Sequence, residues 1–315
     1  MALDPQAAAL LASLAGAPAP DYARLDAASY RAALAAGGAA SAFGAGDAVA
    51  AEEDLALPGP AGALAARLYR PVAGLDGGDE ALALTVFFHG GGFVACGIDT
   101  HANLCRTLAA RARTLVLSVD YRLAPEARFP AAAHDALAAV RWAAAHAVQL
   151  GARPDALAVA GDSAGGNLAA VCAQQLRNEV TIAHQLLLYP VLDCAHEHPS
   201  YESFGQSYLL DAGLMRWFKH QYFDADADRA CPLASPLGTE SLDQVAPATI
   251  ISAEYDPLRD EAERYAARLA QAGVAATLVR WPGQIHGFAS MLGVFDAADA
   301  ALSFGAHALH AALYR

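Results

Sequence analysis

The chain has 315 residues, 56% of them hydrophobic, which is enough to build a large core. Its formal net charge is −13 and no run of Lys or Arg occurs, which argues against binding of nucleic acid or another polyanion. The composition therefore fits a small, neutral or apolar substrate, and no stretch is apolar and long enough to predict stable membrane insertion.

The expected location is cytoplasmic. The first residues contain Asp4 and no early Lys or Arg, whereas a signal peptide needs a basic start. The five cysteines form no CxxC pair and have no regular spacing, which is typical of a reducing compartment. They are Cys96, Cys105, Cys172, Cys194 and Cys231.

Residues 1–45 are rich in alanine and are predicted to be helical. From residue 64 onward, short apolar runs alternate with amphipathic stretches. Strands are predicted over residues 64–69, 82–88, 114–119, 156–160, 182–189, 249–253 and 277–281. Helices are predicted over residues 101–113, 131–150, 164–178, 258–272 and 294–313. This alternation predicts an α/β fold with a mostly parallel sheet covered on both faces, and ligands bind such sheets beyond the carboxyl ends of the strands.

Residues 193–245 interrupt the alternation and are rich in aromatic side chains. Such an insertion is either a lid over the site or a packed surface excursion. Together with about residues 1–45 it is expected to form a helical cap. No internal repeat or linker marks a second unit, so residues 1–315 are predicted to form one domain.

Residues 89–93, His-Gly-Gly-Gly-Phe, directly follow an apolar strand. Three successive glycines allow backbone N–H groups to turn toward one point, as stabilisation of a developing oxyanion requires. We expect Gly91 and Gly92 to be two of these donors. A glycine triplet alone is usually an ordinary loop, so this interpretation depends on the motifs that follow.

Residues 161–166, Gly-Asp-Ser-Ala-Gly-Gly, lie between a predicted strand and a predicted helix. A serine between two glycines on such a turn is a nucleophile elbow, in which Gly161 and Gly165 avoid collisions at the tight bend. The turn would expose the Ser163 hydroxyl and place the N–H of Ala164 beside it as a third oxyanion donor. Asp162 is interpreted as a structural anchor of the turn.

A serine nucleophile needs a base, and the base needs an orienting acid. In chain order the acid should follow a later strand, where Asp256 stands before Pro257; Glu254 is the second choice. The base should follow the next strand, where His286 precedes Gly287. Asp256 could instead simply cap the following helix.

These motifs resemble the bacterial hormone-sensitive-lipase-like family of α/β-hydrolases, the group with a Gly-Asp-Ser-Ala-Gly elbow. The matching segments extend in order over about residues 64–290: residues 89–93, 120–126, 129–132, 161–166, 189–190, 256–260 and 286–288. The resemblance implies an α/β-hydrolase fold with an eight-stranded, mostly parallel sheet and a helical cap. It also implies a serine carboxylesterase for short-acyl esters, with Ser163, Asp256 and His286 as the catalytic triad. The N–H groups of Gly91, Gly92 and Ala164 would form the oxyanion hole.

Two other functions stay open at this point. The same triad could serve an amidase, a deacetylase or an acyltransferase, and a hydrolase fold can also become a non-catalytic binding protein. No cofactor is expected, because no GxGxxG or P-loop motif is present, and residues 196–198 and 224–228 lack a full set of metal ligands. A homodimer through the last edge strand would match the family.

The substrate itself is expected to be a small apolar ester with an acyl chain of about two to eight carbons, because a closed apolar cleft of ordinary size holds small ligands. Bulky apolar side chains in the cap and near the motifs are candidates for the pocket wall, although each could equally belong to the core. They are Phe93, Tyr189, Leu209, Leu210, Trp217 and Phe288.

Overall fold

The computed structural model describes residues 2–16, 21–36, 43–72 and 81–315, so residues 17–20 and 37–42 of the predicted cap segment lie outside the described part. The α-helices are α1 Pro5–Leu14, α2 Ala27–Ala36, α4 Ala102–Ala112, α5 Ala131–Ala145, α6 Ala164–Gln175, α7 Pro199–Phe204, α8 Ala212–Tyr222, α9 Arg259–Gln271 and α10 Asp296–Leu313. The strands are β1 Val49–Gly59, β2 Gly62–Pro71, β3 Leu82–Phe88, β4 Thr114–Val119, β5 Ala152–Asp162, β6 His184–Leu188, β7 Ala248–Tyr255 and β8 Ala276–Ile285.

One eight-stranded sheet has the order β1-β2-β4-β3-β5-β6-β7-β8. β1 and β2 pair antiparallel, as do β2 and β4, and every other neighbouring pair is parallel. The central strands are continuous apolar runs because both of their faces are buried; all six residues of β4 are buried, for example. The prediction of a mostly parallel, eight-stranded sheet is confirmed.

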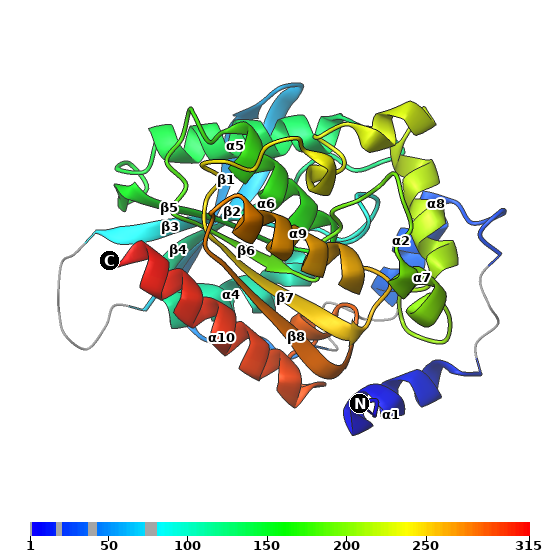
Figure 1. Ribbon diagram of the computed structural model, residues 1–315. Coiled ribbons are helices and arrows are strands. Elements are labelled where there is room, and N and C mark those ends of the chain that lie inside the picture. The colour runs from blue at the N-terminus through cyan, green and yellow to red at the C-terminus, as the bar shows by residue number, and fades with distance from the viewer. Residues whose placement is uncertain (1, 17–20, 37–42, 73–80) are drawn as a thin grey trace.

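Helices cover both faces of this sheet (Figure 1). Helices α5, α6 and α9 lie on one face, where their apolar side chains join the larger core cluster. Helices α4 and α10 lie on the other face and enclose a second cluster that includes Leu104, Leu108, Leu302 and Leu309. The sheet is therefore the middle layer of three, as expected for an α/β fold.

The first strand, β1, is absent from the sequence prediction. It contains Glu52, Glu53 and Asp54, so its sequence lacks the apolar run by which the other strands were found. These acids instead pair with arginines: Glu52 with Arg106, Glu53 with Arg70, and Asp54 with Arg67. β1 is an edge strand, and charged side chains there are compatible with pairing on one side only.

Helix α5 ends at Ala145 rather than at the predicted residue 150. The chain turns back toward the sheet there, and the N–H of Ala152 donates to the carbonyl of Ala147 at 2.8 Å. The apolar periodicity of residues 146–150 thus belongs to a turn in which Ala147 and Leu150 are buried while Val148 is exposed, and periodicity alone does not distinguish such a turn from a last helical turn.

The N-terminal helix α2 and the inserted helices α7 and α8 gather at one end of the sheet (Figure 1). The ring of Tyr30 on α2 lies 5.2 Å from that of Trp217 on α8, and Trp217 Nε1 donates to the carbonyl of Leu25 at 2.9 Å. The hydroxyl of Tyr22 donates to Asp211, the N-cap residue of α8, at 2.7 Å. Segments nearly 200 residues apart in sequence are therefore joined by aromatic packing and hydrogen bonds.

Candidate active site

Ser163 stands at a sharp turn between β5 and α6. Its backbone has φ 53° and ψ −117°, a conformation that non-glycine residues rarely adopt and that costs about 1–3 kcal/mol. A Cβ atom on Gly161 would lie 2.3 Å from the backbone carbon of Gly165, and one on Gly165 would lie 1.9 Å from the carbonyl oxygen of Phe88. Both glycines are thus required sterically, as the elbow motif predicts.

A continuous chain of hydrogen bonds starts at the Ser163 hydroxyl. Ser163 Oγ lies 2.9 Å from Nε2 of His286, and Nδ1 of the same ring lies 2.7 Å from Oδ2 of Asp256. The three side chains follow β5, β8 and β7 respectively, at the carboxyl ends of strands in the same sheet. Because Asp256 accepts from Nδ1–H, the lone pair of Nε2 faces the serine hydroxyl, as a general base requires.

Asp256 is fully buried, and its second oxygen is held in place. Oδ1 accepts the backbone N–H of Leu258 at 2.8 Å, which leaves Oδ2 for the imidazole. The alternative acid, Glu254, instead accepts the backbone N–H of Gly283 at 2.7 Å. The structure thus brings Asp256, and not the second choice, to the imidazole of His286.

The glycine run after β3 has a backbone conformation that favours glycine. Gly91 and Gly92 have φ values of 115° and 63°, and the Gly91 carbonyl accepts from both Val94 and Ala95. Within the described residues the N–H groups of Gly91 and Gly92 donate to no protein acceptor. Ala164 is the first residue of α6, where backbone N–H groups lack a helical acceptor. All three predicted donors are therefore at chain positions where a ligand oxygen could accept from them.

Phe218 on α8 packs directly against this loop, which the sequence did not predict. A Cβ atom on Gly92 would lie 2.3–2.5 Å from carbons of the Phe218 ring. The two residues border a narrow cavity of about 10 Å³, close to the volume needed for one water molecule. Its other lining residues are Phe93, Val191, Cys194, Met215, Lys219, Tyr222 and Phe223.

The six predicted wall residues lie in different places. Phe93 lines the narrow cavity and stacks on Tyr222 with ring centroids 4.1 Å apart. The Tyr189 ring lies 4.8 Å from that of His286. The other four are distributed as follows: Leu209 is partly exposed, Leu210 is buried, Trp217 is buried against Tyr30, and Phe288 is fully buried beside Tyr189 and Trp281.

Trp217 and Phe288 are therefore core residues, the alternative that the sequence left open. Trp217 uses its indole N–H to hold the N-terminal segment, and Phe288 belongs to the core cluster on the α4 and α10 face. Aromatic side chains are equally suited to cores and to pocket walls, so their position in the sequence could not separate these roles.

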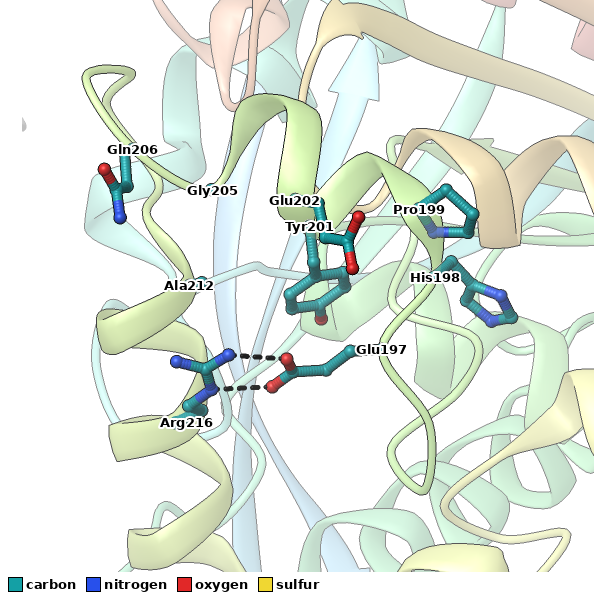
Figure 2. A pocket seen from close by; sticks show the side chains of 9 residues that line it. All are labelled: Glu197, His198, Pro199, Tyr201, Glu202, Gly205, Gln206, Ala212 and Arg216. Atoms are coloured by element: carbon teal, nitrogen blue, oxygen red, sulfur yellow. Dashed lines mark hydrogen bonds and ion pairs between the residues drawn. The ribbon is translucent and has the colours of Figure 1, made fainter.

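A larger pocket of about 370 Å³ opens between α7 and α8 (Figure 2). None of Ser163, Asp256 and His286 is among its lining residues. Arg216 and Glu197 form a two-pronged ion pair at its wall, with distances of 2.8 and 2.6 Å. This pocket is therefore separate from the hydrogen-bonded Ser163, His286 and Asp256.

Over the described ranges, no three His, Cys, Asp or Glu side chains are grouped so that they could hold a metal ion. His196 and His198, which the sequence places close together, both bond to Asp193 instead. None of the helices in the described part of the chain has the length and apolarity to cross a membrane.

Comparison with known proteins identifies relatives of this chain. Residues 85–290 match a family model described as the alpha/beta hydrolase fold. The chain is 47% identical over 247 residues to the carboxylic ester hydrolase LipN of Mycobacterium tuberculosis, a match that covers 76% of this chain and 64%, just under two thirds, of that relative. It is 43% identical over 249 residues to an ethyl acetate hydrolase of Pseudomonas putida, covering 78% of each chain.

Solved structures are similar to this chain over nearly its whole length. A hyperthermophilic esterase from Pyrobaculum calidifontis superimposes with a TM-score of 0.90 at 38% identity and covers 99% of both chains. An α/β hydrolase enzyme from the metagenome of Lake Arreo superimposes with a TM-score of 0.91 at 37% identity and covers 98% of both. The chain therefore belongs to the hormone-sensitive-lipase-like family of α/β-hydrolase-fold carboxylic ester hydrolases.

Proposed function

We propose that this chain hydrolyses short-acyl carboxylic esters with Ser163 as nucleophile, His286 as general base and acid, and Asp256 as the residue that orients His286. The observation that carries the proposal is the continuous hydrogen-bond chain from Ser163 Oγ through both ring nitrogens of His286 to Asp256. The burial of Asp256 supports its role, because a carboxylate away from water interacts strongly with an imidazolium.

The reaction has two steps. His286 Nε2 takes the proton of Ser163 Oγ while that oxygen bonds to the ester carbonyl carbon. When the tetrahedral intermediate collapses, the bond to the alcohol oxygen breaks, and this oxygen takes the proton from His286. Water then attacks the acyl-enzyme while His286 takes its proton; the bond between the carbonyl carbon and Ser163 Oγ breaks, Oγ takes that proton back, and the carboxylic acid is released.

The carbonyl oxygen gains negative charge in both steps. The N–H groups of Gly91, Gly92 and Ala164 are proposed to stabilise it, since removal of one such donor typically costs about 3–4 kcal/mol of transition-state stabilisation. Support comes from the positive φ angles of both glycines and from the position of Ala164 at the start of α6. No metal or cofactor is needed for this chemistry.

The apolar side chains around the narrow cavity beside Gly92 are proposed to contact the acyl chain. At about 10 Å³ the cavity has room for about one water molecule, so acyl groups at the short end of the two-to-eight-carbon range would displace its lining least. Phe218 and Phe93 would form its walls, and Tyr189 would border the reacting ester through its contact with His286.

We propose that the described parts of residues 1–45 and 193–245 form the cap of a single domain. The contacts of Tyr30 with Trp217 and Phe218 support this, because Phe218 in turn packs on Gly92. A cap that touches the oxyanion loop would set substrate access and exclude water from the reacting ester.

Amide hydrolysis and acyl transfer remain chemically accessible to the same triad. The names of the relatives, a carboxylic ester hydrolase, an ethyl acetate hydrolase and esterases, favour esters. Matched rates on an ester, an anilide and an alcohol acceptor would separate these activities, with the ester fastest by at least about 100-fold if the proposal holds.

The proposed activity is tested with p-nitrophenyl esters of increasing acyl length. We expect kcat/KM to be highest for short acyl chains and to fall beyond about eight carbons. Ser163→Ala should abolish turnover, while Ser13→Ala, at an exposed position on α1, should retain it. Full activity in Ser163→Ala would overturn the proposal.

Two further proposals concern the environment of the protein. All five cysteines are unpaired thiols, which supports a reducing, cytoplasmic location.

β8 forms one edge of the sheet, which supports a homodimer through that edge. Light scattering at micromolar concentration would test the dimer, since a monomer mass would contradict it.

A further inference from the structure

Asp162 connects the nucleophile elbow to the oxyanion loop. Its carboxylate is buried below Ser163, and Oδ1 accepts the backbone N–H of Gly90 at 2.8 Å. A Cβ atom on Gly90 would lie 2.5 Å from Oδ2, so the loop rests directly on this carboxylate. The position of Gly91 and Gly92 therefore depends on where Asp162 is held and on its charge.

His101, at the start of α4, is the charged partner of Asp162. Its Nε2 lies 3.2 Å from Oδ1 and 3.3 Å from Oδ2 of the carboxylate. Both side chains are buried, with exposed fractions of 7% for His101 and 5% for Asp162. A carboxylate accepts hydrogen bonds, so Nε2 carries a hydrogen here.

The other nitrogen of His101, Nδ1, faces the side chain of Thr100. Nδ1 lies 2.9 Å from the hydroxyl oxygen of Thr100. That hydroxyl has one hydrogen, and it donates it to the carbonyl of Gly97 at 2.8 Å. With that hydrogen on the Gly97 carbonyl, Thr100 Oγ1 accepts from Nδ1, an arrangement that requires both ring nitrogens of His101 to carry a hydrogen.

The neighbouring His89 is in the opposite state. Its Nδ1 donates to the carbonyl of Gly90 at 2.7 Å, and its buried Nε2 has no hydrogen-bond partner among the described residues. Burial, with the nearby His101 as the next cause, lowers the pKa of His89 to about 4, so this ring is neutral near pH 7. The centroids of the His89 and His101 rings lie 5.7 Å apart.

The remaining titratable groups around Asp162 do not supply a second cation. Burial raises the pKa of Cys96 to about 11 and raises the pKa values of Tyr121 and Tyr189, so all three stay neutral near pH 7. Burial alone would raise the pKa of Asp162, but His101, His89 and the Gly90 N–H outweigh it and lower it. His101 is thus the neighbour that most strongly opposes the effect of burial on the pKa of Asp162.

We propose that the imidazolium of His101 and the carboxylate of Asp162 form a buried ion pair that positions the oxyanion loop by holding the N–H of Gly90. The inference rests on the proposed function of that loop. Hydrogen bonds to a charged acceptor are about twice as strong as neutral ones, so loss of the charge would loosen Gly90 and displace the donors after it. A misplacement of about 1 Å at a reacting group can cost about 100-fold in rate.

The first test is the variant His101→Gln, which keeps a side-chain donor but removes the charge. We expect kcat for a short p-nitrophenyl ester to fall by about 100-fold while KM changes less than about threefold. The affinity for a trifluoromethyl ketone, whose adduct mimics the oxyanion, should fall in parallel. His307→Gln, at an exposed site on α10, is the matched control and should behave as wild type.

A double-mutant cycle separates positioning from general damage. Asp162→Asn retains an oxygen acceptor for Gly90 without the charge. If the two residues act as one unit, Asp162→Asn combined with His101→Gln should lose little more activity than the worse single variant. Fully additive losses, or a His101→Gln variant with wild-type kcat, would overturn the inference without affecting the triad. By contrast, a wild-type protein that hydrolyses no ester would overturn the proposed function itself.

The second test needs no variant. In the wild-type protein labelled with ¹⁵N and assigned by triple-resonance correlation, both ring nitrogens of His101 should carry protons at pH 7, and only one nitrogen of His89 should do so. A neutral His101 ring with one protonated nitrogen would contradict the proposal even if the variants fail to fold.

Discussion

Nδ1 of His286 lies 2.7 Å from Oδ2 of Asp256, a carboxylate with no exposed surface. Asp256→Asn should therefore lower kcat by about 10,000-fold, because an amide in this place favours the wrong tautomer of the imidazole. Steady-state kinetics on a short p-nitrophenyl ester would measure this loss, with KM nearly unchanged. Glu254→Gln is the control: Glu254 accepts from Gly283, and a loss as large as that of Asp256→Asn would contradict the assignment.

The contact between Gly92 and Phe218 gives a second prediction. Gly92→Ala would place a methyl group 2.3–2.5 Å from the Phe218 ring and should reduce kcat by about 100-fold as the oxyanion loop shifts. Phe218→Ala removes the obstacle, so the double variant should recover part of the loss, measured as kcat/KM. No recovery would mean that the positive φ of Gly92, rather than the cap contact, sets the requirement.

Arg31 links the N-terminal helix to the segment behind the oxyanion loop. Its guanidinium donates to the carbonyls of Val94 and Ala124 at 2.6 and 2.7 Å, and both of these residues are buried. Arg31→Met should destabilise the fold by about 1–3 kcal/mol, because these carbonyls lose a charged donor. Urea unfolding measures this change.

The ion pair of Arg31 with Glu126 is the internal control. Glu126 is 65% exposed, so Glu126→Gln should cost less than about 1 kcal/mol in the same unfolding experiment. Equal losses in the two variants would show that the ion pair, and not the bonds to the carbonyls, stabilises the helix.

The two buried histidines His89 and His184 predict loss of stability in mild acid. Burial lowers both pKa values to about 4, whereas the unfolded chain has the ordinary value of 6.5. Between pH 4 and 6.5 the unfolded state binds more protons, so stability falls as pH decreases through that window, by roughly 3 kcal/mol for each histidine. The pKa of Asp162 is lowered from the ordinary value of 3.8, so its contribution to stability is also lost on acidification, but only below about that pH.

Urea unfolding at pH 7.5, 6 and 5 would measure the acid effect. His184→Gln can still bond to the Thr249 hydroxyl, which lies 2.9 Å from His184 Nε2, but it cannot titrate. This variant should therefore lose less stability between pH 7.5 and 5 than the wild type. If His184→Gln lost as much stability as the wild type between pH 7.5 and 5, titration of His184 could not be the cause of the loss.

The sequence predicts the central sheet well because its strands are buried on both faces. The apolar runs at residues 82–88 and 114–119 coincide with β3 and β4. β1 was missed because it lacks such an apolar run. Its acidic side chains pair with arginines on β2 and α4, and this pairing exists only in the folded structure.

The juxtaposition of Ser163, Asp256 and His286 was predictable because local sequence shapes the loop that carries each of them. The elbow needs Gly161 and Gly165, and Asp256 and His286 each follow a strand. The parts of the site that the sequence did not reveal depend on distant contacts: Phe218 reaches Gly92 from the inserted segment, and His101 reaches Asp162 from the next helix. The positions of Trp217 and Phe288 in the core were not predictable for the same reason, because the local sequence does not determine whether an aromatic side chain packs in the core or in a pocket wall.

The central claim, that Ser163 is the nucleophile of an ester hydrolase, is tested most directly by active-site labelling. A p-nitrophenyl alkylphosphonate should release one p-nitrophenolate per chain, abolish ester hydrolysis, and leave a single adduct that peptide mass spectrometry locates on Ser163. Labelling of a different residue, or ester hydrolysis that persists in fully labelled protein, would contradict the account.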